Sequence, residues 1–324
     1  MPESKARTWR QWVRRVPFLD RSLRRLRRSD EIEAFQYSLQ RLRGFDAEPF
    51  LVRFPPGHFY SPVPNIRDIR ENEDKIFRRS TRRLEGIELN EDAQLDLLKT
   101  LAPMINDVTL PSEPQPDLRY CTRNPGYGRG DALTLQALIR HLRPSRYLEV
   151  GSGWSTALAL DTNDRWLQGT MRVTCIEPFP DELNRLLRPE DDVEVIQAPV
   201  QSAGLDRFRE LEPGDFLFID CSHVVKTGSD SHYVMTRVLP AVPAGVYIHI
   251  HDIFWPFEYP EDWVYEGRAW NEAYLLHAFL LFNPTFEIVL FNDWLMHAHH
   301  DLLEREVPGM APGAGAALWL HRRA

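Results

Sequence analysis

The chain has 324 residues, of which 43% are hydrophobic and 27% charged, so it is long and apolar enough to bury a sizeable core. Its formal net charge of −8 makes a nucleic-acid partner unexpected, because such binders present a basic surface to the phosphate backbone. No stretch approaches the ~18 consecutive apolar residues that a membrane-spanning helix needs, so no transmembrane segment is expected.

The cysteines indicate a reducing compartment. Cys121, Cys175 and Cys221 stand far apart and form no CxxC pair, which argues against a disulfide framework or a zinc knuckle. The Arg-rich N-terminus lacks the apolar segment of a secretory signal, so none is expected. Together these features predict a cytoplasmic protein.

The N-terminal segment is basic, whereas the remainder of the chain is acidic. Residues 1–28 hold ten Lys or Arg and two acidic residues, a balance of +8 that leaves −16 for the rest. Trp9, Trp12, Val13 and Val16 recur with helical spacing, which predicts a basic amphipathic helix within residues 1–45. Two interpretations stay open: a solvated helix docked on the protein or a partner subunit, and a peripheral contact of residues 5–28 with an anionic membrane surface.

Proline and aromatic residues dominate residues 47–65, where Pro55, Pro56, Pro62 and Pro64 exclude a regular helix. An ordered loop that buries its aromatic side chains is expected there, namely Phe50, Phe54, Phe59 and Tyr60.

Charged helices are predicted over residues 67–105, with Asn90 as an N-cap. Three prolines in residues 111–117 suggest a hinge. We therefore expect an N-terminal extension of residues 1–117, acting as an acceptor cap or interaction region, followed by a main domain of residues 118–324.

From residue 130 onward, short apolar strands alternate with helices. This rhythm predicts an α/β fold of the Rossmann-like type, a mostly parallel sheet with helices on both faces. Helices are expected at 131–141, 156–161, 181–187, 231–239 and 271–282, and strands at 147–150, 173–176, 193–196, 216–219, 246–250, 286–291 and 316–320.

Polar residues follow four of these strands, at the edge where such sheets bind their ligands. They are Glu149-Val-Gly151-Ser-Gly153, then Glu177, then Asp220-Cys-Ser-His223, and finally His249-Ile-His251-Asp252. The two glycines permit a tight turn and a close approach of a ligand to the backbone. The carboxylate of Glu149 would repel a pyrophosphate but suits a ligand with an amine and a sulfonium. The carboxylate of Glu177 can accept hydrogen bonds from both hydroxyls of a ribose.

The segments YLEVGSGWST (147–156), IEPFP (176–180), FLFIDCSHV (216–224) and HIHDIF (249–254) resemble the class I methyltransferases that use S-adenosylmethionine (SAM). The resemblance is greatest to a bacterial branch of small-molecule methyltransferase-like proteins and covers about residues 120–324. It implies seven strands with the last antiparallel. It also implies that Glu149, Gly151, Ser152 and Gly153 line the methionine part of SAM and that Glu177 holds the ribose. Tyr127 and Asp131 would close over the cofactor, and Asp220 counts among the cofactor-binding candidates.

Candidate catalytic groups stand at the mouth of the same edge. His223 and His251 are the predicted general bases, because an unperturbed imidazole titrates near pH ~6.5. His249 points to the same face as His251 but lies deeper in its strand, so we expect a packed core histidine there. Asp252 is expected to assist catalysis by orienting one of the histidines.

A bound Mg²⁺ is a further hypothesis. Catechol O-methyltransferase and its relatives take metal ligands from the ends of the fourth and fifth strands, where Asp220 and Asp252 stand here. This chain has His251-Asp252 where that family has Asp-Asn. The alternative is that the two carboxylates bind no metal and instead orient His223 or His251 through hydrogen bonds.

These features predict a methyltransferase that acts on a small-molecule acceptor, at a hydroxyl oxygen. The aromatic segments 54–62 and 254–263 are expected to wall the acceptor pocket. Two alternatives remain, an NAD-dependent oxidoreductase and a non-catalytic SAM-binding module. Thr156 argues against the oxidoreductase, because a dinucleotide fingerprint wants glycine at that position.

Overall fold

The computed structural model describes residues 53–311 and 313–324. The predicted N-terminal helix, the basic residues 5–28 and Phe50 lie outside the described residues. The chain divides into two compact units, one comprising residues up to 76 together with 260–269, the other comprising 77–259 and 270–324. The expected extension of residues 1–117 stays a prediction. In the described part, no helix has the length and apolar character needed to cross a membrane.

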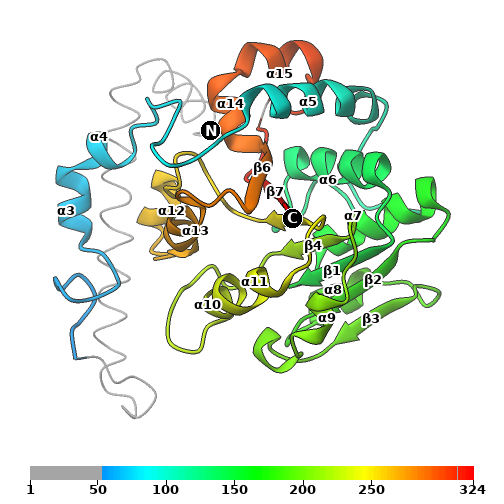
Figure 1. Ribbon diagram of the computed structural model, residues 1–324, viewed down its shortest axis with the longest axis horizontal. Helices are drawn as coiled ribbons and strands as arrows, with labels where there is room; N and C mark the ends of the chain where they lie inside the picture. The colour runs from blue at the N-terminus through cyan, green and yellow to red at the C-terminus, as the bar shows by residue number, and fades with distance from the viewer. Residues whose placement is uncertain (1–52, 312) are drawn as a thin grey trace, which may run out of the picture. The chain divides into compact units, whose positions relative to one another are not determined.

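The second unit is built on one seven-stranded sheet with the order β3-β2-β1-β4-β5-β7-β6 (Figure 1). Strands β1 to β5 are parallel, and β7 runs antiparallel between β5 and β6. The bounds are β1 Arg146–Val150, β2 Arg172–Ile176, β3 Val193–Ile196, β4 Phe216–Ile219, β5 Tyr247–Ile250, β6 Phe286–Phe291 and β7 Leu318–Arg322. The predicted fold class and the antiparallel last strand are confirmed.

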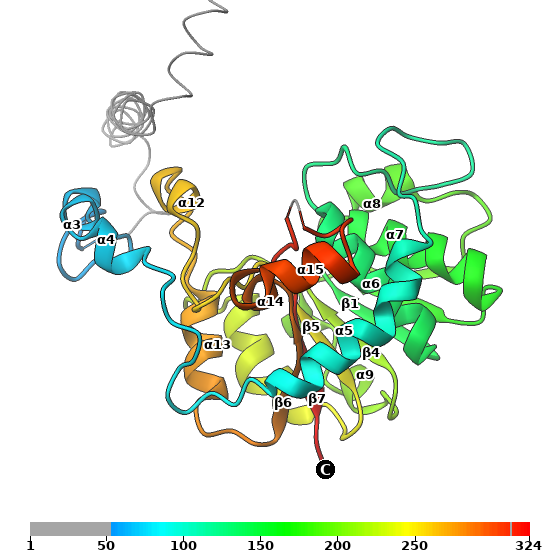
Figure 2. The same ribbon diagram turned by 90° about the horizontal axis from the view of Figure 1, so that it is seen from above.

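Helices cover both faces of this sheet. Figure 1 shows α5 and α6 on one side of the strands and α10 and α11 on the other, and Figure 2 shows α15 beside α5. The helices of this unit are α5 Glu91–Asn106, α6 Arg129–Leu142, α7 Trp154–Thr162, α8 Asp181–Leu186, α9 Asp206–Arg209, α10 Asp230–Tyr233, α11 Leu239–Ala241, α13 Glu272–Leu280, α14 Asn292–Ala298 and α15 His300–Glu306. Short π-helical and 3₁₀ turns complete them: η1 Asn163–Leu167, η2 Val200–Ser202 and η3 Val234–Val238.

Two predicted helix and strand ends differ from the structure in detail, one in its capping and one in its first residue. Asn90 precedes α5 as expected, but its side chain donates to the carbonyl of Ile288 and does not cap the helix. β7 begins at Leu318 and not at residue 316, because the N–H groups of Ala316 and Ala317 donate to the Asp131 carboxylate.

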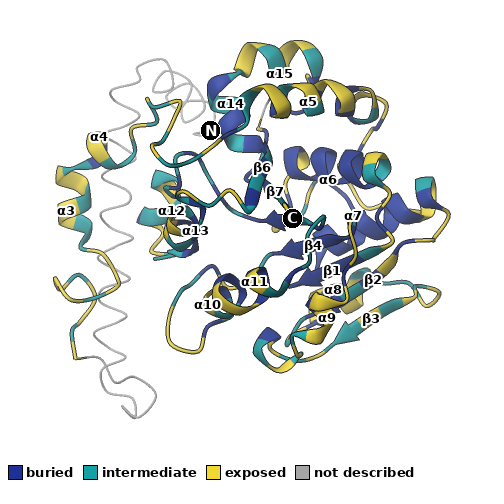
Figure 3. Cartoon of the chain, viewed as in Figure 1, coloured by how far each residue is buried: buried dark blue, intermediate teal, exposed yellow. Residues whose placement is uncertain are grey.

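Asp131 is buried, and its carboxylate ties the start of α6 to the chain that enters β7. Figure 3 shows α6 and the central strands as the most buried parts of the unit. The continuous apolar sequence of β4, in which all four residues are buried, is typical of a strand covered on both faces. A rigid sheet therefore holds the loops at its carboxyl edge.

The described part of the first unit contains α3 Ile66–Glu71, α4 Glu73–Ile76 and α12 Glu261–Tyr265. The loop that precedes α3 is irregular, as its prolines predicted. The expected burial of its aromatics is wrong for two of them, because Phe59 is 90% exposed and Tyr60 68% exposed. Among the described residues of this unit only Glu73 and Tyr265 are buried, so these residues form no apolar core around the rings.

Candidate functional site

The turn after β1 requires glycine for a steric reason. Gly151 has φ +103°, and a Cβ at this position would meet the carbonyl oxygen of Asp220 at 2.0 Å. Gly153 follows with φ +149°. The N–H of Asp220 donates to the carbonyl of Val150 at 2.9 Å, so the ends of β1 and β4 lie in contact. The glycine turn is thus placed directly against the first residue after β4.

Glu149 lies beneath this turn and is fully buried. Its carboxylate accepts hydrogen bonds from the hydroxyls of Ser155 and Thr156, and Thr156 Oγ1 in turn accepts from the N–H of Gly153. Burial raises the pKa of Glu149 to about 8, although the two hydroxyl hydrogen bonds oppose the shift. Glu149 therefore braces the turn from inside, a role the sequence reasoning missed, and its contact with a ligand stays a prediction.

Two side chains beside the turn fit a polar ligand. The hydroxyl of Ser152 is buried and has no hydrogen-bond partner among the described residues. Glu177 follows β2 and is half-buried, and its Oε1 accepts from the N–H of Phe179 at 2.8 Å. Burial raises the pKa of Glu177, as expected for a carboxylate in a partly enclosed position. The unpartnered hydroxyl and the carboxylate fit the amino-acid and ribose parts of a nucleoside ligand.

Tyr127 is buried on the other side of this edge. Its ring packs 5.1 Å from the ring of His251 and 5.9 Å from that of Phe218, and its hydroxyl donates to the Asp131 carbonyl. The side-chain oxygen of Asn124 accepts from the N–H of Tyr127 at 2.6 Å and fixes the loop that carries it. The structure thus brings Tyr127 to His251, while its closure over a cofactor stays a prediction.

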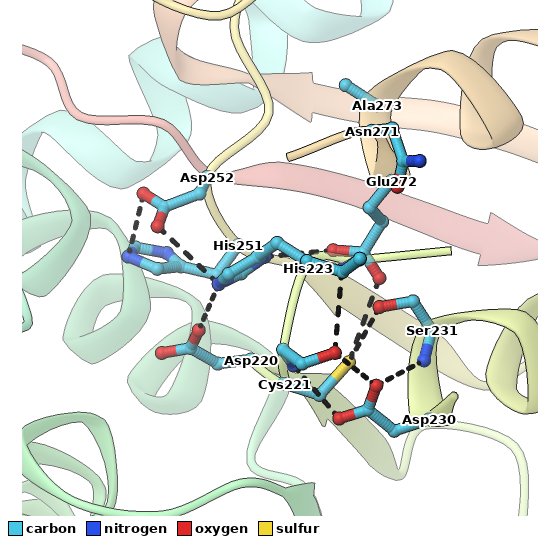
Figure 4. A network of polar contacts seen from close by, with 12 residues as sticks. Asp220, Cys221, His223, Asp230, Ser231, His251, Asp252, Asn271, Glu272 and Ala273 are labelled. Atoms are coloured by element: carbon cyan, nitrogen blue, oxygen red, sulfur yellow. Dashed lines mark hydrogen bonds and ion pairs between the residues drawn. The ribbon is translucent and has the colours of Figure 1, made fainter. Parts of the chain in front are cut away.

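An acid–histidine cluster forms where β4 and β5 end, and we use this name for Asp220, His223 and Asp252 (Figure 4). Nε2 of His223 lies 3.2 Å from Oδ1 of Asp220 and 3.6 Å from Oδ2 of Asp252. One ligand-type atom from each residue falls within 4.8 Å of the others. Three of the predicted catalytic or metal-binding residues are therefore brought together.

A third acidic residue, Glu272, holds the opposite side of the His223 ring. Its Oε2 lies 2.9 Å from His223 Nδ1, and its Oε1 accepts from the Cys221 thiol. The N–H groups of Asn271 and Glu272 both donate to the carbonyl of His223. The sequence reasoning missed Glu272, although one acidic residue at the start of the otherwise apolar segment EAYLLHAFL was a usable signal.

The charges in this region determine the protonation of its histidines. Burial alone would lower the pKa of His223, but the carboxylates of Asp220 and Glu272 outweigh it and raise the pKa to about 10. The expectation that His223 titrates as an unperturbed imidazole is therefore wrong. The pKa of His251 is also raised. Burial would lower this pKa, but the carboxylates of Asp252, Asp220 and Asp131 outweigh the effect of burial.

His249 is fully buried, as predicted, and its ring stacks on Phe218 at 4.0 Å. Its Nε2 lies 3.3 Å from Nδ1 of His251, and burial holds its pKa well below the usual value. Nε2 of His251 is 3.6 Å from Oδ1 of Asp252. A neutral His249 thus hydrogen-bonds Nδ1 of His251, and Nε2 of His251 faces Asp252 in the acid–histidine cluster.

The backbone at the cluster adopts a left-handed conformation. His223 and Asp252 both have φ +57°, which is uncommon for residues other than glycine. Such conformations concentrate at active sites, where the surrounding structure holds them in place. Two of the left-handed non-glycine residues therefore coincide with the candidate site.

Of the two aromatic segments expected to wall an acceptor pocket, 54–62 belongs to the first unit. In the other segment, Trp255 and Phe257 are buried against Phe291. Trp270, which the sequence reasoning missed, lies closer to the cluster, with its ring 4.4 Å from that of His223. The aromatic walls stay a prediction.

The geometry thus joins the glycine turn after β1 to the acid–histidine cluster at the carboxyl edge of a Rossmann-like sheet. Residues 148–253 match the family model described as a methyltransferase domain. A protein of Archaeoglobus fulgidus, described as uncharacterized, is 39% identical over 163 residues, which are 49% of this chain and 74% of that protein. This match and the strand order of the sheet support the predicted resemblance to the class I SAM-dependent methyltransferases.

Solved structures of low sequence identity are also similar. The methyltransferase PaMTH1 of Podospora anserina, bound to S-adenosylhomocysteine, is 13% identical and has a TM-score of 0.40, with 78% of this chain and 96% of that chain covered. The O-methyltransferase TomG of Streptomyces achromogenes, in complex with SAM, is 14% identical and has a TM-score of 0.37, with 74% and 92% covered.

Proposed function

We propose that the chain transfers the methyl group of SAM to a hydroxyl oxygen of a small-molecule acceptor. The supporting observation is the contact between the glycine turn and the acid–histidine cluster, in which Gly151 abuts the backbone of Asp220. Methyl transfer requires the acceptor atom to lie about 3 Å from the methyl group, so the cofactor turn and the acceptor groups must be neighbours. The location of the protein in the cytoplasm stays a prediction from the sequence.

In this proposal, SAM supplies an electrophilic methyl group on a sulfonium. The Glu177 carboxylate accepts hydrogen bonds from the ribose hydroxyls. Ser152 and the N–H groups of Gly151 and Gly153 bind the amino-acid part of SAM. Tyr127 and Asp220 complete the cofactor contacts. Glu149 stays protonated beneath the turn and keeps its shape, because its pKa is raised to about 8.

The acceptor hydroxyl must lose its proton as the C–S bond breaks and the new C–O bond forms. We propose that Nε2 of His251 accepts this proton, because Nδ1 of the same ring is hydrogen-bonded to His249. His223 carries a proton at neutral pH and holds the carboxylates of Asp220 and Asp252 in position. The two carboxylates in turn favour the charged form of His251 that follows proton uptake.

A divalent cation at the acid–histidine cluster is a second candidate. Asp220, His223 and Asp252 would hold it, and Glu272 binds the far nitrogen of His223 as carboxylates commonly do behind metal-binding histidines. The imidazole nitrogen suits Mn²⁺, Fe²⁺ or Zn²⁺ better than the Mg²⁺ expected from the sequence. Such an ion would lower the pKa of a bound acceptor hydroxyl.

Calorimetric titration with SAM tests the cofactor part of the proposal. We expect saturable binding that is abolished in Gly151→Ala, where a Cβ would meet Asp220 at 2.0 Å. Gly204→Ala is the matched control, because Gly204 also has a positive φ but nothing lies within 4 Å of its added Cβ. Glu177→Ala removes the ribose contact without altering the turn, and we expect it to weaken binding by about 10–100-fold.

Unchanged SAM binding in both Gly151→Ala and Glu177→Ala would refute the assigned site. Titration with NADH separates the oxidoreductase alternative, since saturable NADH binding without SAM binding would favour it. Incubation of the protein with a metabolite extract and methyl-labelled SAM separates an enzyme from a binding module. Label transferred to a small molecule, and lost in His251→Gln, would support the proposed catalytic role.

A further inference from the structure

The first unit carries a built aromatic turn, which we call the aromatic tip and define as Phe54, His58, Phe59 and Tyr60. Phe54 stacks on His58 at 4.8 Å and contacts Tyr60 at 5.1 Å, while Phe59 meets Tyr60 edge-on at 5.1 Å. The N–H of His58 donates to the Pro55 carbonyl, and the N–H of Tyr60 donates to Nδ1 of His58. The tip therefore has a defined shape.

The tip is exposed to an unusual degree. Phe59 is 90% and Tyr60 68% exposed, although they stand side by side in the sequence and in space. In the described part of the first unit, only Glu73 and Tyr265 are buried. Phe59 and Tyr60 thus form an exposed aromatic pair, an arrangement that marks interaction surfaces.

The basic N-terminal sequence that precedes the tip favours an anionic partner. Arg53 directly precedes the tip, and its guanidinium lies 5.6 Å from the centre of the Phe54 ring. Residues 1–28 of the same chain carry a balance of +8, whereas the whole chain carries −8. The basic sequence and the aromatic rings therefore lie in the same N-terminal part of an otherwise acidic protein.

We propose that the aromatic tip inserts into the headgroup region of an anionic lipid bilayer. Exposed Phe and Tyr rings suit this region, because they combine apolar area with a polar or cationic neighbour that stays in water. Insertion of a few rings gives weak binding alone, and a polybasic segment supplies the second attraction that makes it stable. The proposal is independent of methyl transfer, since none of its residues belongs to the SAM or acid–histidine site.

Vesicle co-sedimentation of the full chain tests the proposal. We expect binding to vesicles of phosphatidylcholine and phosphatidylglycerol in equal parts, and much weaker binding to phosphatidylcholine alone. The double variant Phe59→Ala/Tyr60→Ala should lose at least about tenfold in partition to the anionic vesicles, because two exposed rings no longer insert. Phe282→Ala is the matched control, because Phe282 is 82% exposed in the second unit and should leave binding unchanged.

Thermal melts of both variants should match the parent, since the substituted rings are exposed. Equal loss of vesicle binding in the Phe282 control and the tip variant would overturn the assignment of the surface. The absence of binding of the parent protein to anionic vesicles would overturn the proposal itself. Light scattering that shows self-association, abolished in the tip variant while vesicle binding persists, would assign the tip to a second copy of the chain instead.

Discussion

Nδ1 of His223 lies 2.9 Å from Oε2 of Glu272, a buried contact between residues 49 positions apart in the sequence. The contact determines which nitrogen of His223 faces the acid–histidine cluster, because Nδ1 is held by Glu272 and Nε2 is left toward Asp220 and Asp252. It also joins the loop after β4 to the start of α13, since the carbonyl of His223 accepts from the N–H of Glu272. Glu272 is therefore a positioning residue for the proposed chemistry.

Glu272→Gln should lower kcat for methyl transfer by about 10–100-fold, because a neutral amide no longer holds the charged His223 ring. The dissociation constant for SAM should stay within about twofold, since Glu272 is not among the cofactor contacts. Transfer of labelled methyl groups measures the first quantity and calorimetry the second. Glu287→Gln is the control, because the Glu287 carboxylate pairs with Arg323 and is not part of the acid–histidine cluster. A variant that loses SAM binding as strongly as turnover would show a general structural role instead.

Removal of metal ions distinguishes the two candidates for the acid–histidine cluster. We expect methyl transfer to continue after dialysis against a strong chelator, because His223 already supplies a positive charge between Asp220 and Asp252. Metal content measured by emission spectroscopy before and after dialysis shows whether an ion was removed. Turnover that stops on chelation and returns with Mn²⁺ or Mg²⁺ would assign the cluster to a metal instead.

Glu149 makes a testable contribution to the pH dependence of stability. Burial raises its pKa from the usual 4.5 to about 8, so the folded protein keeps a proton that the unfolded chain releases in this range. The free energy of unfolding should therefore fall as the pH rises from 4.5 to 8. The Glu149→Gln variant cannot ionise at this position. Its Tm relative to that of the parent should therefore increase as the pH rises through this range. Thermal melts at several pH values give the comparison, and parallel curves for the two proteins would contradict the buried, protonated state.

The sequence predicted the sheet and the edge that carries the site because both depend on local patterns. Short apolar strands such as 216–219 define the sheet, and a polar residue such as Asp220 at the strand end marks the edge. The role of Glu149 could not be predicted in this way, because it depends on hydroxyls that the turn folds back onto it. Glu272 reaches His223 only through the packing of α13, and the exposure of Phe59 depends on how few residues surround it.

A buried ion-pair network at Arg119 allows a last prediction. The Arg119 side chain is 3% exposed and pairs with Asp161, Asp164 and Asp191, of which Asp161 and Asp191 are also largely buried. Asp161 additionally accepts from the N–H groups of Arg119 and Tyr120. The network thus joins the segment before α6 to the end of α7 and to the loop before β3.

Arg119→Met should lower the free energy of unfolding by about 3–5 kcal/mol, because it leaves buried carboxylates without a counter-charge. Arg207→Met, which breaks an exposed pair with Glu194, should cost less than about 1 kcal/mol. Urea unfolding measures both. Since burial already favours the neutral form of Asp161, the stranded carboxylates should take up protons as the pH falls, and the cost of Arg119→Met should shrink below pH ~5. A cost that stays constant from neutral to acidic pH would mean that lost packing of the arginine stem, and not the uncompensated charge, destabilises the variant.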